Sequence, residues 1–140
     1  MAWPFPIEEG HVLAFTRATG EQAPAPGDVV PLTFAALTAL HDPGHMRDMP
    51  PGGPPATGGE TLLHAEQHFE YFAPLRVGAK TSVTERPGES WTKTSRRGEQ
   101  LTFTELIKEL RDDRGELVVR ARTVLVSKAS AGAVPDAPPP

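Results

Sequence analysis

The chain has 140 residues, no cysteine and a formal net charge of −4 at pH 7. This length suits one domain that buries its own core, and without cysteine there are no disulfides or thiolate metal sites. The acidic balance argues against nucleic acid or an anionic membrane as a partner. No apolar run approaches the roughly 20 residues of a membrane span, and the N-terminus lacks the regions of a signal peptide. We therefore expect a soluble, cytoplasmic protein.

The first helix is expected after an extended opening at residues 4–7. Glu8 and Glu9 place acid where a helix begins, and the helix should continue to Thr19 with Gly20 as its C′ residue. Its buried stripe is expected to consist of Val12, Leu13, Phe15 and Ala18.

A second helix is expected after a loop at residues 21–30. Pro31 suits its first turn, and the helix should end by Asp42. The residues spaced to cover its buried face are Leu32, Phe34, Leu37 and Leu40. His41 would then be a cation at the helix C-terminus, and His45 a loop residue.

The segment from residue 43 to 59 has ten Gly or Pro among its seventeen residues, so we expect a long loop over residues 43–60. From residue 127 the chain becomes rich in Ala and Pro, which is typical of disorder. The domain is accordingly predicted to span residues 1–128, followed by a disordered tail at 129–140.

The second half predicts antiparallel strands. They are expected at residues 62–72, 80–95 with a bulge at Pro87-Gly88, 101–110 and 117–126. Segment 101–110 also fits a helix, because Thr102 and Glu105 mimic a capping box, but the tight turn at residues 112–115 favours a hairpin. Helices followed by a strand meander indicate an α+β domain, with the second helix on the concave face of the sheet.

The strand at 62–72 carries an unusual load of titratable side chains. His64, Glu66 and His68 are two residues apart and are expected to share one face, either lining a polar pocket or forming structural hydrogen bonds. Three residues of one strand are poor at enclosing an ion, so no metal and no cofactor is predicted. The aromatic residues expected in the core or a dimer interface are Phe69, Tyr71, Trp91 and Phe103.

Four segments, in order, carry a family resemblance. They are residues 5–20 (Phe-Pro-Ile-Glu-Glu-Gly-His-Val-Leu-Ala-Phe-Thr-Arg-Ala-Thr-Gly), Pro31-Leu-Thr-Phe34, residues 63–78 beginning Leu-His-Ala-Glu-Gln, and the hairpins from Arg97 to Leu125. This series resembles the MaoC-like hot-dog dehydratases, in particular the FAS1-like or MaoC N-terminal dehydratase domains. It covers nearly all of residues 5–126.

The resemblance implies a hot-dog fold that dimerises sheet to sheet. It implies acyl thioesters of CoA or acyl-carrier protein as ligands, and the reversible hydration of a trans-2-enoyl thioester to an (R)-3-hydroxyacyl thioester. The positions that would bind the substrate are Pro31, Thr33, Phe34, His64 and Glu66.

The resemblance also bears on catalysis, because hydration needs a base for the water, an acid for the α-carbon and donors for the thioester oxygen, which a helix N-terminus can supply. Catalytic relatives carry Gly-Asp-x-Asn-Pro-x-His before the central helix. Aligned on Gly20, this chain has Glu21 in place of the Asp, Ala23 in place of the Asn and Pro26 in place of the His. Proline cannot move a proton, so no catalytic residue is predicted. The weak candidates are Glu21, His64 and Glu66.

Three hypotheses follow. The first is a subunit that shapes the acyl pocket while a catalytic hot-dog partner supplies the Asp and His. The second is a self-sufficient homodimeric hydratase that uses His64 and Glu66. The third is an acyl-CoA-binding protein without catalytic activity.

Overall fold

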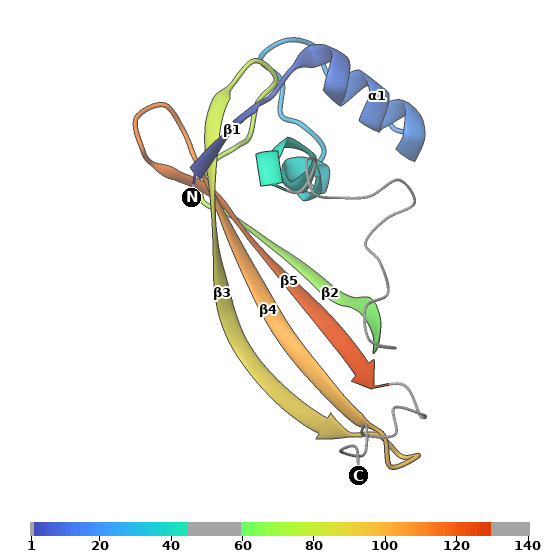
Figure 1. Ribbon diagram of the computed structural model, residues 1–140. Helices are drawn as coiled ribbons and strands as arrows, with labels where there is room; N and C mark the ends of the chain where they lie inside the picture. The colour runs from blue at the N-terminus through green and yellow to red at the C-terminus, as the bar shows by residue number, and fades with distance from the viewer. Residues whose placement is uncertain (1, 45–59, 130–140) are drawn as a thin grey trace.

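The structure, a computed structural model, describes residues 2–44 and 60–129. A curved antiparallel sheet holds a short 3₁₀-helix against its upper part, and an α-helix packs outside that helix (Figure 1). The sheet order is β1-β3-β4-β5-β2. The elements are β1 (Ala2–Pro6), α1 (Glu9–Thr19), η1 (Phe34–His41), β2 (Glu60–Tyr71), β3 (Lys80–Thr94), β4 (Gln100–Arg111) and β5 (Leu117–Ala129).

The strand predictions are confirmed, including the ambiguous segment. Residues 101–110 lie inside β4, which pairs with β3 on one side and β5 on the other. The Asp112 carboxylate accepts the backbone N–H groups of Arg114 and Glu116, each at 2.9 Å. The turn so formed fixes the β4–β5 hairpin and excludes the helical alternative. The predicted bulge in β3 lies between Pro87 and Ser90.

Helix α1 begins and ends as predicted, and Gly20 follows it with φ 76° and its N–H bonded to the Thr16 carbonyl. Its buried stripe differs from the prediction: Val12 and Thr16 are buried, whereas Ala18 is exposed. Thr16 can be buried because its hydroxyl donates to the Leu13 carbonyl at 3.0 Å, which satisfies the polar group without water.

The second helix is shorter and tighter than predicted. It is the 3₁₀-helix η1, and a 3₁₀-helix has about 3.0 residues per turn instead of the 3.6 of an α-helix. The buried residues are therefore Phe34, Ala35 and Thr38. Phe34 and the partly buried Leu37 were predicted correctly, but Leu32 (63% exposed) and Leu40 (49%) were not.

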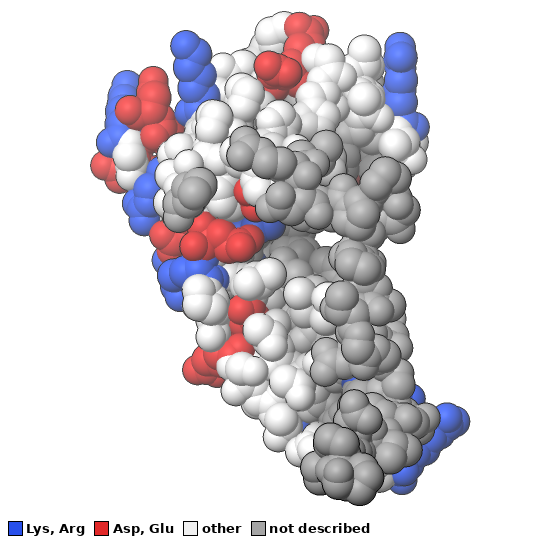
Figure 2. All heavy atoms as spheres, viewed as in Figure 1, with Lys and Arg blue, Asp and Glu red and all other residues white. Residues whose placement is uncertain are grey.

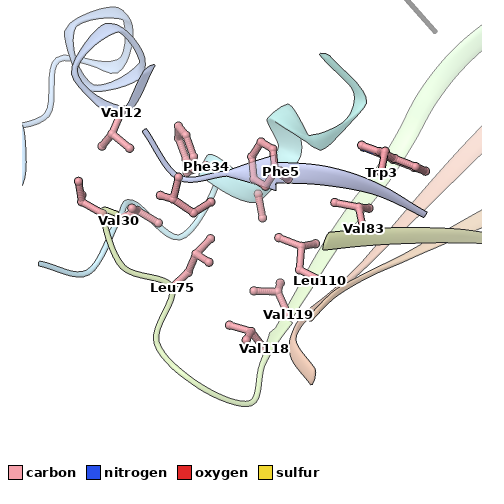
Figure 3. Close-up of a cluster of buried hydrophobic side chains, with 13 residues drawn as sticks. Trp3, Phe5, Val12, Val30, Phe34, Leu75, Val83, Leu110, Val118 and Val119 are labelled. Carbon is pink, nitrogen blue, oxygen red and sulfur yellow. The ribbon is translucent and has the colours of Figure 1, made fainter. Parts of the chain in front are cut away.

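The core lies where η1 meets the upper part of the sheet (Figure 3). Phe34 stacks on Phe5 of β1 at a centroid distance of 5.8 Å, and Phe15 of α1 meets its edge at 5.5 Å. The Trp3 indole N–H donates to the Thr38 carbonyl at 3.0 Å, tying β1 to η1. Strands contribute Val83, Leu110, Val118 and Val119 beneath this aromatic group.

The convex face of the sheet, opposite the helices, carries several ion pairs. Arg122 pairs with Glu105 at 2.5 Å, and Arg120 pairs with Glu109 at 3.1 Å. In Figure 2 acidic and basic side chains alternate along the left side of the view, which is the convex side in Figure 1. Because charges of opposite sign lie within contact distance, the face carries no strong single-sign potential toward a partner.

Two predictions lie largely outside the described residues. The Gly/Pro-rich loop is described only at its ends, and of the tail only Ala129 is described. Ser127 and Lys128 belong to β5, so the chain remains ordered beyond the point where the Ala/Pro composition begins. The domain boundary at residue 128 stays a prediction.

Phe34→Ala should destabilise the fold strongly, because Phe34 is 0% exposed and stacks on Phe5. We expect a loss of about 3–5 kcal/mol in the free energy of unfolding, the usual cost of removing a buried aromatic ring. Leu40→Ala on the same helix, at a 49% exposed side chain, should cost less than about 1 kcal/mol. Urea unfolding followed by circular dichroism measures both, and equal losses would contradict this core assignment.

Candidate functional site

The loop between α1 and η1 is held by the segment that follows β2. Val30 N–H donates to the Leu75 carbonyl at 2.9 Å, and Val77 N–H donates to the Asp28 carbonyl at 3.0 Å. Gly27, with φ 83°, donates to the Val77 carbonyl at 3.1 Å. Val30 and Leu75 are buried. The loop therefore has a fixed course although it contains no helix or strand.

This loop surrounds a hollow of about 490 Å³. Among the described residues that line it, Glu21 is the only titratable one, and Gln22 and Thr33 supply an amide and a hydroxyl. The remaining lining is apolar. The lining residues are Glu21, Gln22, Pro24, Val29, Val30, Pro31, Leu32 and Thr33.

A second, largely apolar hollow of about 390 Å³ adjoins the first and shares Val29 and Leu32 with it. Its other lining residues come from the end of β2 and the turn after it: Tyr71, Phe72, Ala73 and Pro74. Leu32 and Phe72 are exposed large apolar side chains. Together the hollows form a trough with a polar end at Glu21 and an apolar end at Phe72.

Tyr71 connects the two sides of the trough. Its hydroxyl donates to the Leu32 carbonyl, which joins the end of β2 to the turn before η1. Burial raises the pKa of Tyr71, so the phenol remains protonated and keeps its donor at neutral pH.

The predicted site residues fall in three places. Pro31 and Thr33 line the first hollow, whereas Phe34, the next residue but one after Leu32, belongs to the core. His64 and Glu66 line neither hollow. His64 is separated along β2 from Tyr71 by seven residues, or roughly 23 Å of extended strand.

The prediction that His64 and Glu66 share a face is wrong. The β2–β5 register shifts between them, so His64 pairs with Leu125 and Glu66 with Val124. Paired residues share a face and neighbouring residues alternate, so the bulge at Ala65 turns His64 toward the helix side and Glu66 toward the convex side. Within the described segments no group of three His, Asp or Glu side chains is arranged to hold a metal ion.

Glu66 instead belongs to the ion pairs on the convex face of the sheet. His68 Nε2 lies 2.8 Å from its carboxylate, and this hydrogen bond is the main cause that lowers the pKa of Glu66. Glu105 accepts the backbone N–H of Glu89 at 3.1 Å and is paired with Arg122. These two contacts lower the pKa of Glu105. Both carboxylates are therefore held ionised, which suits structural partners better than proton donors.

The backbone N–H groups at the start of η1, which were expected to donate to a thioester oxygen, already donate in part to nearby carbonyl groups. Phe34 N–H donates to the Pro31 carbonyl and Ala36 N–H to the Thr33 carbonyl, each at 3.0 Å. The Thr33 hydroxyl and the Gln22 amide remain as polar groups of the first hollow. The described residues of the trough can thus bind an amphipathic molecule and position it, but Glu21 has no histidine among them with which to share a proton transfer.

Sequence reasoning missed half of the trough. Val29, Leu32 and Phe72 are exposed apolar residues, and the signal that could have found them is their position on either side of turns, at 27–33 and 72–75. Their closeness depends on the pairing of Val29 with Arg76, which joins segments more than forty residues apart in the chain.

Comparison with known proteins identifies the family. The family described as "FAS1-like, dehydratase domain region" matches residues 1–121, and the chain belongs to it. It is thus a member of the MaoC-like hot-dog dehydratases, and its curved sheet around a central helix is the hot-dog fold predicted from the sequence. No curated protein matches the chain by sequence.

Solved structures show the same fold. One is the truncated HadBC (3R-hydroxyacyl-ACP dehydratase) complex of Mycobacterium tuberculosis, with 22% identity, coverage of 90% of this chain and 94% of that chain, and a TM-score of 0.59. A chain of the ChsH1-ChsH2 complex from the same organism has 15% identity, coverage of 96% and 86%, and a TM-score of 0.65.

A third similar structure is HtdX, also from Mycobacterium tuberculosis, with 23% identity and a TM-score of 0.59. The match covers 90% of this chain but 50% of that chain, so the present chain spans about half the length of HtdX. In the described part of this chain, no helix is long and apolar enough to cross a membrane.

Tyr71→Phe should loosen the trough without opening a cavity. It removes the hydroxyl that donates to the Leu32 carbonyl, and we expect a loss of about 0.5–1.5 kcal/mol in the free energy of unfolding. Phe69→Leu, elsewhere on the same face of β2 and also packed against the core, is the comparison for a change in packing alone. Unchanged stability of Tyr71→Phe would show that the hydrogen bond does not hold the turn.

Glu105→Gln should lower stability most at neutral pH. The pKa of Glu105 is below 4.5 in the folded protein, so its ionised form stabilises the fold above that pH, and the contribution is lost as the pH falls through the folded pKa. The stability difference between wild type and variant should therefore shrink on acidification. Urea midpoints over a pH series measure it. Glu99→Gln, at the partly exposed pair with Lys128, should show a smaller effect throughout.

Proposed function

We propose that this chain is the acyl-pocket subunit of an (R)-specific enoyl-thioester hydratase/3-hydroxyacyl-thioester dehydratase, and that a partner hot-dog chain supplies the catalytic Asp and His. The observation that carries the proposal is the composition of the first hollow. It lies in the loop before the central helix, yet Glu21 is its only titratable described residue. A site built to bind but not to move protons fits a subunit whose chemistry is completed elsewhere.

The position of Pro26 supports the proposal that this chain binds the substrate and a partner chain performs the catalysis. It stands where catalytic relatives have His, and the next residue, Gly27, is tied to Val77 by its N–H and to Arg76 through its carbonyl. Without a base paired to Glu21, the chain has no described group at the trough that could both activate water and return the proton to the α-carbon. The partner would perform those two transfers.

The free edge of the sheet supports a partner chain. Within the described strands, β2 lies at the end of the order, runs for 12 residues and pairs with β5. A long edge strand presents unpaired backbone groups to another chain. Two of the similar structures are complexes, HadBC and ChsH1-ChsH2, and association of this chain with a catalytic hot-dog chain or with itself is part of the proposal.

The trough supports an acyl thioester as the ligand, carried by CoA or acyl-carrier protein. Its apolar end, at Phe72 and Pro74, suits an acyl chain, and its polar end, at Gln22 and Thr33, suits a thioester or the amides next to it. His64 and Glu66 do not contribute to it, and their separation onto two faces argues against a homodimeric enzyme that uses them as an acid–base pair.

Co-expression with a catalytic hot-dog chain tests the proposal. The purified complex should hydrate enoyl-CoA, whereas this chain alone should not. Exchanging the partner's catalytic Asp for Asn should reduce kcat by about 100- to 10,000-fold, while Glu21→Gln in this chain should leave it within about threefold. Turnover by this chain alone that is abolished by Glu21→Gln, or failure to associate with any such partner, would refute the subunit role.

Leu32→Trp tests the ligand site within that complex. Leu32 is 63% exposed and lines both hollows, so an indole there should fill the trough without disturbing the core. We expect KM for a long-chain enoyl thioester to rise about tenfold, which corresponds to about 1.4 kcal/mol of lost binding. KM for crotonyl-CoA should change little. Leu40→Trp, at an exposed leucine of η1 that lines neither hollow, is the matched control, and equal effects of the two would contradict the assignment.

A further inference from the structure

Two histidines lie inside the contact that holds α1 against the rest of the fold. The rings of His11 in α1 and His41 in η1 have centroids 5.3 Å apart. His11 meets Phe34 edge-on at 5.2 Å, and His41 meets Phe5 edge-on at 5.1 Å. Both imidazoles are therefore built into the aromatic group that seats η1, which we name the His–Phe cluster (Phe5, His11, Phe15, Phe34 and His41).

Among residues 2–44 and 60–129, the carboxylates identified beside this cluster are those of Glu8 and Asp42. Glu8, at the N-cap of α1, acts on His11. Asp42 follows His41, and its carboxylate accepts the Gly44 N–H at 2.9 Å. β1 has no titratable side chain between Ala2 and Pro6, and η1 has only His41. When both rings are protonated, two positive charges lie in neighbouring rings with centroids 5.3 Å apart, in a half-buried contact where screening by water is weaker than in bulk solvent.

We propose that the His11–His41 pair is an acid-sensitive lock, which holds η1 and α1 together while both rings are neutral and releases them when both become protonated. The rings then pack as aromatic groups at neutral pH and repel each other in mild acid. His is the residue type whose charge changes in this range.

The direction of the pH dependence follows from comparing the pKa of His11 in the packed contact with its pKa in the unfolded chain. Burial, and after it the nearby His41, lower the pKa of His11 below 6.5, against a smaller opposing effect of Glu8. The unfolded or released chain therefore binds the proton more readily than the packed one. Stability of the contact is complete above the unfolded pKa and is lost as the pH falls from about 6.5 toward the folded pKa.

The lock also adjoins the trough. The loop that lines the first hollow starts at Gly20, directly after α1, and ends at Thr33, directly before η1. Release of α1 from η1 would free the Gly20 end of this loop, while the hydrogen bonds of Gly27 and Val30 still hold its second half. The inference concerns the folded chain itself and stands whether or not the chain serves as the proposed acyl-pocket subunit, because its test requires neither substrate nor partner.

Trp3 provides a direct reporter of η1. Its indole is 5% exposed and donates to the Thr38 carbonyl of η1 at 3.0 Å. The chain has two tryptophans, and Trp91 lies far from this contact, stacked on Phe103 of the sheet. The variant Trp91→Phe of the full-length chain thus leaves Trp3 as the single tryptophan, and the wavelength of its emission maximum reports whether η1 remains seated.

In Trp91→Phe, titration from about pH 8 to about pH 5 should shift the Trp3 emission maximum reversibly to longer wavelength, while far-ultraviolet circular dichroism retains the sheet signal. Adding His11→Phe, which keeps an aromatic ring without a charge, should abolish the shift. His68→Gln, at the exposed pair with Glu66, should leave it intact. His41→Phe gives the same test if His11→Phe does not fold.

Two results would overturn the lock. One is an emission maximum that stays constant over this range in Trp91→Phe. The other is a shift of equal size and midpoint in the parent and in both ring-replacement variants.

Discussion

The position of Phe34 is the constraint on which the rest of the structure depends. Its ring is completely buried, stacks on Phe5 and receives the edges of Phe15 and His11. Burying one such ring contributes a few kcal/mol, a large part of the net stability of a domain of this size. Because Phe34 is the first residue of η1, its burial fixes where the preceding loop ends. The trough exists because that loop, pinned at Val30 and Val77, has no freedom left to collapse into it.

The two faces of the sheet serve different purposes. The concave face buries the core at one end and supports the helices. The convex face neutralises its own charges through pairs such as Arg122–Glu105 and Arg120–Glu109. One of these pairs also shapes the backbone: Glu105 accepts the Glu89 N–H at the bulge of β3, and a Cβ on Gly88 would lie 2.7 Å from the Glu105 Cβ. That close approach explains why the bulge carries glycine at this position.

Much of the fold could be predicted because its signals are local. Gly20 and Glu9 mark the ends of α1, and the turn around Asp112 selects a hairpin for a segment that also fits a helix. The buried face of η1 could not be predicted, since Leu32 and Leu40 satisfy an α-helical spacing and only tertiary packing chooses the 3₁₀ geometry. The family was visible in the sequence, and the absence of the Asp/His dyad stays a prediction. The trough was only half visible: Pro31 and Thr33 belonged to a motif, whereas Val29 and Phe72 meet through long-range pairing.

The bulge at Ala65 has a consequence for how this sheet can change. In the sequence, side chains alternate through residues 62–72 without interruption. In the structure, the register shift interrupts this alternation, so that residues before and after Ala65 that would share a face lie on opposite faces of the sheet. If Ala65 were paired with Leu125 in a regular ladder, His64 would lie opposite Val126 on the charged exterior and Leu63 would turn toward the interior, with every other strand left in place. The surface chemistry at this end of the sheet is therefore set by whether one residue stays out of the ladder, and a slip of β2 by one position there would remodel it without any substitution.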